Sequence, residues 1–340
     1  MSAQADRRLV LVAGVGRSGT SLMTGILGKV GFQIPQPEIN ADETNPRGFG
    51  EPAWVVAFHQ RLMRRLRVTV YDSRPAAWEK TDAAADDPEV RSELREWLKQ
   101  QLDQADAVVV KDPRVGWFLS LWRGCAADLV VPTAFIGMLR HPAESLSSAR
   151  RWYGDWQTDA SRAAAWLNVS LEVEHKTREM PRAFVRYENL LAGWAPELRR
   201  VGEALGDPLL RGIEQERFPQ VDEFVDPSLH RDRVGWDQLD VPASVQEMAE
   251  RVWLELQPLA EAGGETPTVR TALDASRVSY AAFYTEVESI AQSSVTALKP
   301  RKRKAPPPPP PTLYVRVARR IPQRYRKRLR AALEPLRRPS

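Results

Sequence analysis

Short apolar runs alternate with helical stretches along most of the chain. Residues 8–14 read RLVLVAG, a run too short to span a membrane and without the order of a secretory signal, so we interpret it as a buried strand. Three further apolar runs occupy residues 107–110, 132–139 and 183–185. A helical segment separates each run from the next, and this β-α-β-α alternation predicts an α/β fold with a parallel sheet flanked by helices.

Helical spacing of apolar residues predicts helices over residues 20–31, 54–66 and 88–104, and a mostly helical region from residue 188 to residue 292. Glycine and proline dominate residues 34–52, which predicts a long loop of the kind that carries function. We therefore expect one α/β domain over residues 6–292, followed by a basic and proline-rich linker over residues 293–311 and a basic tail over residues 312–340.

Charge divides the chain into two unequal parts. Residues 299–340 hold 15 Lys and Arg against one acid, a balance of +14, whereas the remaining 34 basic and 43 acidic residues give −9. The 43% hydrophobic and 27% charged residues are ordinary for a soluble globular protein. The single cysteine, Cys125, excludes an internal disulfide framework and favours a reducing, cytoplasmic compartment.

A glycine-rich turn follows the first expected strand and reads GVGRSGTS over residues 14–21. Backbone N–H groups and a helix N-terminus in such a turn form a binding site for phosphate. We therefore expect a parallel sheet of the kind found in P-loop proteins. An NTP-binding loop of the GxxxxGK[ST] type carries Lys directly after its last glycine, but this chain has Thr20 there. Its basic residue, Arg17, comes two positions before Gly19 instead.

A second anion site is predicted where the third strand ends, in the sequence LRHPAESLSS over residues 139–148. Arg140 closes the strand, Pro142 suits the first position of a helix, and Ser148 lies nearly two helical turns beyond Arg140. An arginine at the strand end and a hydroxyl on the next helix can reach one phosphate together. Ser147 is the alternative to Ser148.

The sequence RSGTSL of residues 17–22 closely resembles the 5′-phosphosulfate loop of sulfotransferases that use 3′-phosphoadenosine 5′-phosphosulfate (PAPS), in the arginine form found in tyrosylprotein sulfotransferases and many bacterial members. The Arg140–Ser148 spacing is similar to the 3′-phosphate motif of that family. Residues 110–114 (VKDPR) resemble its KDP segment, and residues 185–190 (VRYENL) resemble a segment whose tyrosine lies beside the adenine. The resemblance covers roughly residues 8–260.

This resemblance implies the sulfotransferase fold and transfer of a sulfuryl group from PAPS to a hydroxyl acceptor, for which we favour a carbohydrate or glycolipid. By resemblance, the 5′-phosphosulfate is held by five residues of the loop: Arg17, Ser18, Gly19, Thr20 and Ser21. Arg140, Ser148 and Tyr187 would hold the rest of the nucleotide. Sulfuryl transfer is an in-line displacement that depends on positioning and charge stabilisation, and Arg17 and Lys111 are the candidate cations for the leaving group.

The acceptor hydroxyl must lose its proton to a carboxylate or a histidine. Family members that use histidine place it shortly after the lysine of the second strand, where this chain has Asp112, Pro113 and Arg114. A carboxylate from the long loop is therefore favoured. Glu51 is our first choice, because residues 45–51 (NPRGFGE) resemble a segment of bacterial relatives, and Glu43 is the second.

For several other residues we expect a structural role or a position next to the bound nucleotide or acceptor. His59, His141, His175 and His230 are expected to be structural or neighbours of the phosphate, and no Cys/His cluster has the spacing of a metal site. Asp112 is expected to orient Lys111 or to cap the next helix. Trp152, Tyr153 and Trp156 could stack on a sugar, although core packing is the commoner role of such residues. Arg231 and Arg233 belong to a late basic loop that could cover the nucleotide, and the sequon at Asn168 is discounted because it lies in an expected helix.

Six prolines at residues 306–311 and the basic amphipathic segment that follows suggest peripheral attachment to an anionic membrane, at the inner face, with nucleic acid as the less favoured polyanion. Two other functions remain open for the whole chain. One is a P-loop kinase of small molecules, which the missing lysine disfavours. The other is a non-catalytic nucleotide-binding scaffold tethered by its basic tail.

Overall fold

The computed structural model describes residues 7–154, 156–226, 234–298 and 325. Contacts divide the chain into a unit over Met1–Ser289, which contains the sheet, and a second unit over Ile290–Ser340. The helix Gln292–Leu298 (α13) occupies the first part of the region predicted to be linker. Residues 299–324 and 326–340, with the polyproline run and nearly all of the basic tail, lie outside the described residues. Among the described residues, no helix is long and apolar enough to cross a membrane.

Four strands form one parallel sheet, as the apolar runs predicted. They are β1 (Arg8–Ala13), β2 (Ala107–Lys111), β3 (Thr133–Leu139) and β4 (Arg182–Arg186). Their order in the sheet is β2-β1-β3-β4, with β1 paired to both β2 and β3. The strands are apolar at nearly every position because helices cover both faces of the sheet.

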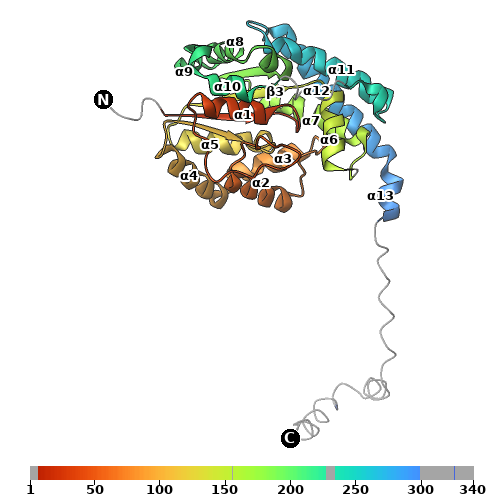
Figure 1. Cartoon of the computed structure of the whole chain (residues 1–340). Helices are drawn as coiled ribbons and strands as arrows, with labels where there is room; N and C mark the ends of the chain where they lie inside the picture. The colour runs from red at the N-terminus through yellow and green to blue at the C-terminus, as the bar shows by residue number, and fades with distance from the viewer. Residues whose placement is uncertain (1–6, 155, 227–233, 299–324, 326–340) are drawn as a thin grey trace. The chain divides into compact units, whose positions relative to one another are not determined.

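Alternate residues of the strands pack into two separate cores. On one face, Val10, Val109, Ile136 and Val185 share a cluster of buried residues with α1, α8, α9 and α10. On the other face, strand residues share a cluster with the helices from α2 to α5, which lie together in Figure 1, and with the later helices α7 and α11. The helices of the first face have the bounds Thr20–Lys29 (α1), Tyr187–Leu205 (α8), Pro208–Arg211 (α9) and Pro219–Phe224 (α10).

The remaining helices have the bounds Ala53–Leu66 (α2), Ala77–Asp82 (α3), Pro88–Leu102 (α4), Leu119–Asp128 (α5), Pro142–Tyr153 (α6), Asp159–Lys176 (α7), Ala243–Leu256 (α11) and Pro267–Ile290 (α12). Short 3-10 helices cover Ala83–Asp86 (η1), Val115–Phe118 (η2), Gln215–Arg217 (η3), Trp236–Gln238 (η5) and Gln257–Ala260 (η6).

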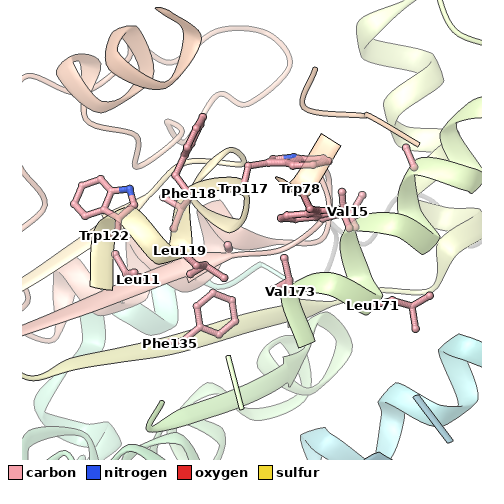
Figure 2. Packing of buried hydrophobic residues seen from close by; sticks show 14 of the residues in the cluster. Leu11, Val15, Trp78, Trp117, Phe118, Leu119, Trp122, Phe135, Leu171 and Val173 are labelled. Atoms are coloured by element: carbon pink, nitrogen blue, oxygen red, sulfur yellow. The ribbon is translucent and has the colours of Figure 1, made fainter. Parts of the chain in front are cut away.

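Aromatic side chains fill the core on the second face of the sheet. Trp78 of α3 stacks on Trp117 of η2, with ring centroids 3.8 Å apart and planes inclined by 15°. Figure 2 shows this pair above Leu11 and Phe135, which come from neighbouring strands. Large aromatic side chains dominate core energetics, so this cluster anchors α3 and η2 firmly against the sheet.

The strand order creates a crevice at the carboxyl ends of β1 and β3. The connection after β1 leads to β2, on one side of β1. Strand β3 lies on the other side of β1, and the connection after β3 leads away from β1, so the two connections diverge. Ligands of open α/β sheets bind at such a switch point. The glycine-rich turn follows β1, Arg140 follows β3 and Lys111 ends β2, so three predicted site segments meet at this edge.

The two ends of the long loop of residues 34–52 are joined by hydrogen bonds, and its end packs against α1. The Ile39 N–H donates to the Glu51 carbonyl at 2.8 Å, and the Ala53 N–H donates to the Pro37 carbonyl at 2.8 Å. Gly50 adopts a left-handed conformation (φ 65°), and a Cβ there would come within 2.9 Å of the Thr24 side chain on α1. This close approach brings Glu51 to the crevice.

Candidate active site

The glycine-rich turn, residues 14–20, has the geometry of an anion cradle and is called the phosphate loop below. Arg17 and Gly19 have left-handed backbones, with φ of 73° and 96°, and α1 begins at Thr20 without a side-chain cap. The unsatisfied N–H groups of a helix N-terminus attract negative charge. Ser18 is 2% exposed, and its hydroxyl has no hydrogen-bond partner among the described residues and does not line the pocket.

Arg17 links the phosphate loop to the second predicted anion site. Its Nε donates to the Ser148 hydroxyl at 3.1 Å, across 131 residues of sequence, and its Nη2 donates to the Thr44 carbonyl at 3.4 Å. Arg140 donates from Nη1 to the Arg17 carbonyl at 3.2 Å and from Nε to Glu144 at 2.9 Å. The two signatures therefore form one continuous basic site.

Tyr187 closes the same site from the end of β4. A Cβ on Gly19 would overlap its ring, and the Arg140 guanidinium carbon lies 4.9 Å from the ring centroid. The ring is thus held between the phosphate loop and the arginine predicted to bind the 3′-phosphate. Tyr187 thereby lines the pocket that is predicted to bind the nucleotide.

Lys111 and Glu51 form a buried ion pair that lines the same pocket. Lys111 Nζ donates to Glu51 Oε1 at 2.5 Å, to the Phe49 carbonyl at 3.1 Å and to the Ser21 hydroxyl at 3.2 Å. Burial raises the pKa of Glu51 above its usual range, and the charge of Asp112 adds to this rise while Lys111 opposes it. A raised pKa makes this carboxylate a stronger base than an ordinary glutamate side chain.

His59 is not available as a base. Trp122 Nε1, which can only donate, points to His59 Nε2 at 3.0 Å, so the ring proton lies on Nδ1 and is donated to Asp112 at 3.3 Å. Asp112 also accepts from the Arg114 N–H at 2.6 Å and from its Nη1 at 2.7 Å. Complete burial opposes ionisation of Asp112, but these partners lower its pKa to about 2. Asp112 thus fixes the turn after β2, and no described hydrogen bond joins it to Lys111.

Nearly all the predicted residues line one pocket: Arg17, Gly19, Thr20, Ser21, Glu51, Lys111, Arg140, Ser148 and Tyr187. Ser18 lies buried in the same loop, and Ser148 rather than Ser147 faces the pocket. Glu43, the second candidate base, is exposed and outside the lining. His230, Arg231 and Arg233 lie outside the described residues.

Sequence reasoning assigned no role to three further lining residues, Arg47, Arg151 and Phe224. Arg151 could have been found, because it follows Ser148 by three residues and shares its helix face. Phe224 could not, since it comes from α10 and reaches the pocket only by packing against α1 at Gly25. Among the described charged side chains, the pocket is lined by five basic residues and one acid, Glu51.

The interpretation as core packing was wrong for Trp152 and Trp156. Trp152, in the last turn of α6, is half-buried and lines the pocket, whereas Trp156 lies beyond α6 and is 59% exposed. The side chain of Tyr153 lies outside the described set.

No group of three or more His, Cys, Asp or Glu side chains in the described parts of the chain could hold a metal ion. The site therefore consists of a phosphate loop, two arginines, a hydroxyl on α6 and a buried carboxylate–ammonium pair. A pocket with these groups can bind a polyanion and can accept a proton from a neighbouring hydroxyl.

Comparison with known families agrees with this geometry. The profile of the sulfotransferase family matches residues 10–210, more than half of the chain, and includes the phosphate loop, Lys111, Arg140, Ser148 and Tyr187. The chain belongs to the sulfotransferase family, and its four-stranded parallel sheet flanked by helices is consistent with the fold of that family. Its activity is that of a transferase that moves sulfuryl groups. None of the curated proteins compared with the chain matches it.

Proposed function

We propose that this protein transfers a sulfuryl group from PAPS to a hydroxyl group of a carbohydrate or glycolipid, with Glu51 as the general base. The observation that carries the proposal is the meeting of three groups at one pocket. These are the phosphate loop, the Arg140–Ser148 pair, and the buried Glu51–Lys111 pair.

The pocket suits a donor with two separated phosphate groups. The phosphate loop and Arg17 would hold the 5′-phosphosulfate, and Arg140 with Ser148 would hold the 3′-phosphate. Arg17 already donates to Ser148, so the two subsites lie within reach of one side chain. A single triphosphate chain would use the first subsite and leave the second without a partner.

Proton transfer is assigned to the Glu51–Lys111 pair. Glu51 would accept the proton of the acceptor hydroxyl. At the same time the hydroxyl oxygen would bond to sulfur, and the bond from sulfur to the phosphate oxygen of the donor would break. Lys111 would stabilise the charge on the departing phosphate oxygen, because its three N–H donors can exchange Phe49 or Ser21 for that oxygen. One buried pair would thereby act on both the attacking hydroxyl and the departing phosphate oxygen.

The half-buried ring of Trp152 at the pocket supports a carbohydrate acceptor. An aromatic ring with one accessible face offers a stacking surface to the apolar face of a sugar. A glycolipid acceptor would agree with the charge of the chain, since a +14 tail can hold the enzyme at the anionic inner face of a membrane. Such placement corresponds to a cytoplasmic enzyme with peripheral attachment.

Calorimetric titration tests the donor, and product detection tests the reaction. Adenosine 3′,5′-bisphosphate should bind and ATP–magnesium should not; tighter binding of ATP–magnesium would contradict the proposal and favour a kinase. A transfer screen with ³⁵S-labelled PAPS over glycans, glycolipids and phenols should then yield a labelled carbohydrate. Nucleotide binding without transfer to any acceptor would favour a non-catalytic scaffold.

A further inference from the structure

Residues 70–74, between α2 and α3, form an irregular segment whose backbone carbonyls are all hydrogen-bonded. Each of its five carbonyl oxygens accepts a hydrogen bond from a side chain of another part of the chain. The donors, in order from residue 70 to residue 74, are Trp117 Nε1 (3.2 Å), Gln157 Nε2 (3.1 Å), Asn168 Nδ2 (2.8 Å), the Tyr280 hydroxyl (2.6 Å) and Asn168 Nδ2 again (3.2 Å). We call residues 70–74 the pinned segment.

The donors come from η2, from the connection between α6 and α7, from α7 and from α12, up to 207 residues away in sequence. A loop at the protein surface satisfies most of its carbonyls with water, so this number of dedicated donors fixes the backbone beyond what burial requires. Asn168 uses all of its described side-chain hydrogen bonds to hold this segment and the adjacent core. It is 2% exposed, donates to two carbonyls of the segment and accepts from Trp78 Nε1, so it has no role as a glycosylation site.

The pinned segment presents Tyr71 to the phosphate loop. The Tyr71 ring is 8% exposed and belongs to the core, and its hydroxyl lies directly against Gly16. A Cβ on Gly16 would overlap the hydroxyl oxygen and would come within 2.9 Å of Cζ. The backbone of Gly16 is not left-handed, so the glycine is required here for space and not for conformation.

Tyr71 does not line the pocket itself, whereas Gly16 does. Contact between them therefore acts on the ligand through the loop backbone. A phosphate loop binds anions through N–H groups that must point to one position, and a rigid stop behind Gly16 limits the orientations that the loop can adopt.

We propose that Tyr71 is a positioning residue for the phosphate loop, and that the pinned segment holds Tyr71 in place. The inference rests on the proposed function, because the loop is taken to bind the 5′-phosphosulfate. It also gives α12 a part in donor binding, since Tyr280 fixes Ser73 although α12 lies beyond the residues 10–210 matched by the family profile.

Tyr71→Phe tests the role of the hydroxyl while the ring keeps its packing. The dissociation constant of adenosine 3′,5′-bisphosphate should rise about 3–10-fold, because the loop loses the oxygen that lies against Gly16. The KM for PAPS should rise with it, while kcat changes much less because Glu51 and Lys111 are untouched, and the thermal midpoint should stay near that of the wild type. Unchanged affinity for the bisphosphate would overturn the inference.

A double-mutant cycle separates contact with Tyr71 from contact with the ligand. Gly16→Ala should weaken bisphosphate binding by roughly 5–100-fold, as overpacking displaces the loop. Leucine lacks the three Tyr71 atoms nearest to the added Cβ, so Gly16→Ala in a Tyr71→Leu background should cause only a small further loss. Gly212→Ala is the matched control, because its Cβ would find only ordinary contacts.

An equal loss on Gly16→Ala in both backgrounds would show that the glycine serves close approach of the ligand, and would overturn the inference while leaving the proposed function intact. If the wild-type protein does not bind the bisphosphate, the proposed function fails and the inference fails with it. The two failures are thus distinguished by the wild-type titration.

Discussion

Lys111 Nζ and Glu51 Oε1 lie 2.5 Å apart, although 60 residues separate them in the chain. Lys111 ends β2, and Glu51 ends the long loop that packs on α1 through Gly50. Both side chains are almost completely buried, so each charge depends on the other for stabilisation. A bound donor that took over a hydrogen bond of Lys111 would release the carboxylate to act as a base.

Replacement of this carboxylate is the first prediction. Glu51→Gln should lower kcat by about 10²–10⁴-fold, the usual contribution of a general base, and should leave the affinity for adenosine 3′,5′-bisphosphate near that of the wild type. Steady-state kinetics and calorimetry measure the two quantities. Glu43→Gln is the matched control on the same loop. Full activity of Glu51→Gln together with loss in Glu43→Gln would transfer the role to Glu43.

The pH profile of the wild type gives a second prediction. Burial raises the pKa of Glu51, and only the ionised carboxylate can take a proton. The value of kcat/KM should therefore fall as the pH drops through this raised pKa, above the 4.5 of an ordinary glutamate. The acid limb should be absent from the residual activity of Glu51→Gln. If both proteins show the same limb, another group controls it.

Arg140 provides the third prediction. Arg140→Ala removes the proposed charged partner of the 3′-phosphate and the hydrogen bond to the Arg17 carbonyl, so bisphosphate affinity should fall by about 1.5–3 kcal/mol, or roughly 10–150-fold. The affinity for adenosine 5′-monophosphate, which lacks the 3′-phosphate, should fall far less. Arg61→Ala, at an exposed ion pair with Glu93, should leave both affinities unchanged. Equal losses for the two nucleotides would remove Arg140 from the 3′-phosphate site.

Acid unfolding should report on Asp112, the fourth prediction. Its pKa of about 2 in the folded protein lies below the ordinary 3.8, so its contribution is complete above pH 3.8 and is lost as the pH falls through 2. At about 1.4 kcal/mol per unit of pKa, the loss is roughly 2 kcal/mol. Urea unfolding between pH 5 and pH 2 should show this loss in the wild type and in the exposed control Asp106→Asn, but not in Asp112→Asn. A parallel decline in all three proteins would contradict it.

The basic tail gives the last prediction. Deletion of residues 299–340 should leave the fold and bisphosphate binding intact and abolish association with anionic vesicles, because the −9 body is repelled by an anionic surface that attracts the +14 tail. Flotation of full-length and truncated protein with vesicles rich in anionic lipid measures this. Binding should weaken with added salt, which screens charge over about 8 Å at physiological ionic strength. Full-length protein that stays soluble at low salt would assign the tail to another partner.

Local patterns determined the elements of this protein and the outline of its site. Runs such as residues 8–14 predict buried strands because a parallel sheet is covered on both faces, and helical spacing located α2 and α4 to within two residues. The phosphate loop and the Arg140–Ser148 spacing could also be predicted from local sequence patterns. Each consists of one turn and its adjoining helix, whose geometry is set by a few consecutive residues.

Contacts between distant segments were decided only by the tertiary structure. The sequence gives no sign that Lys111 pairs with Glu51, that Arg17 reaches Ser148, or that Trp122 fixes the tautomer of His59. These pairs depend on the order β2-β1-β3-β4 and on how the long loop packs against α1. Gly16 shows the difference most clearly. Its place in a glycine-rich turn is written in the sequence, but the reason that no side chain fits there is Tyr71, which arrives from 55 residues away on a segment held by four other parts of the fold.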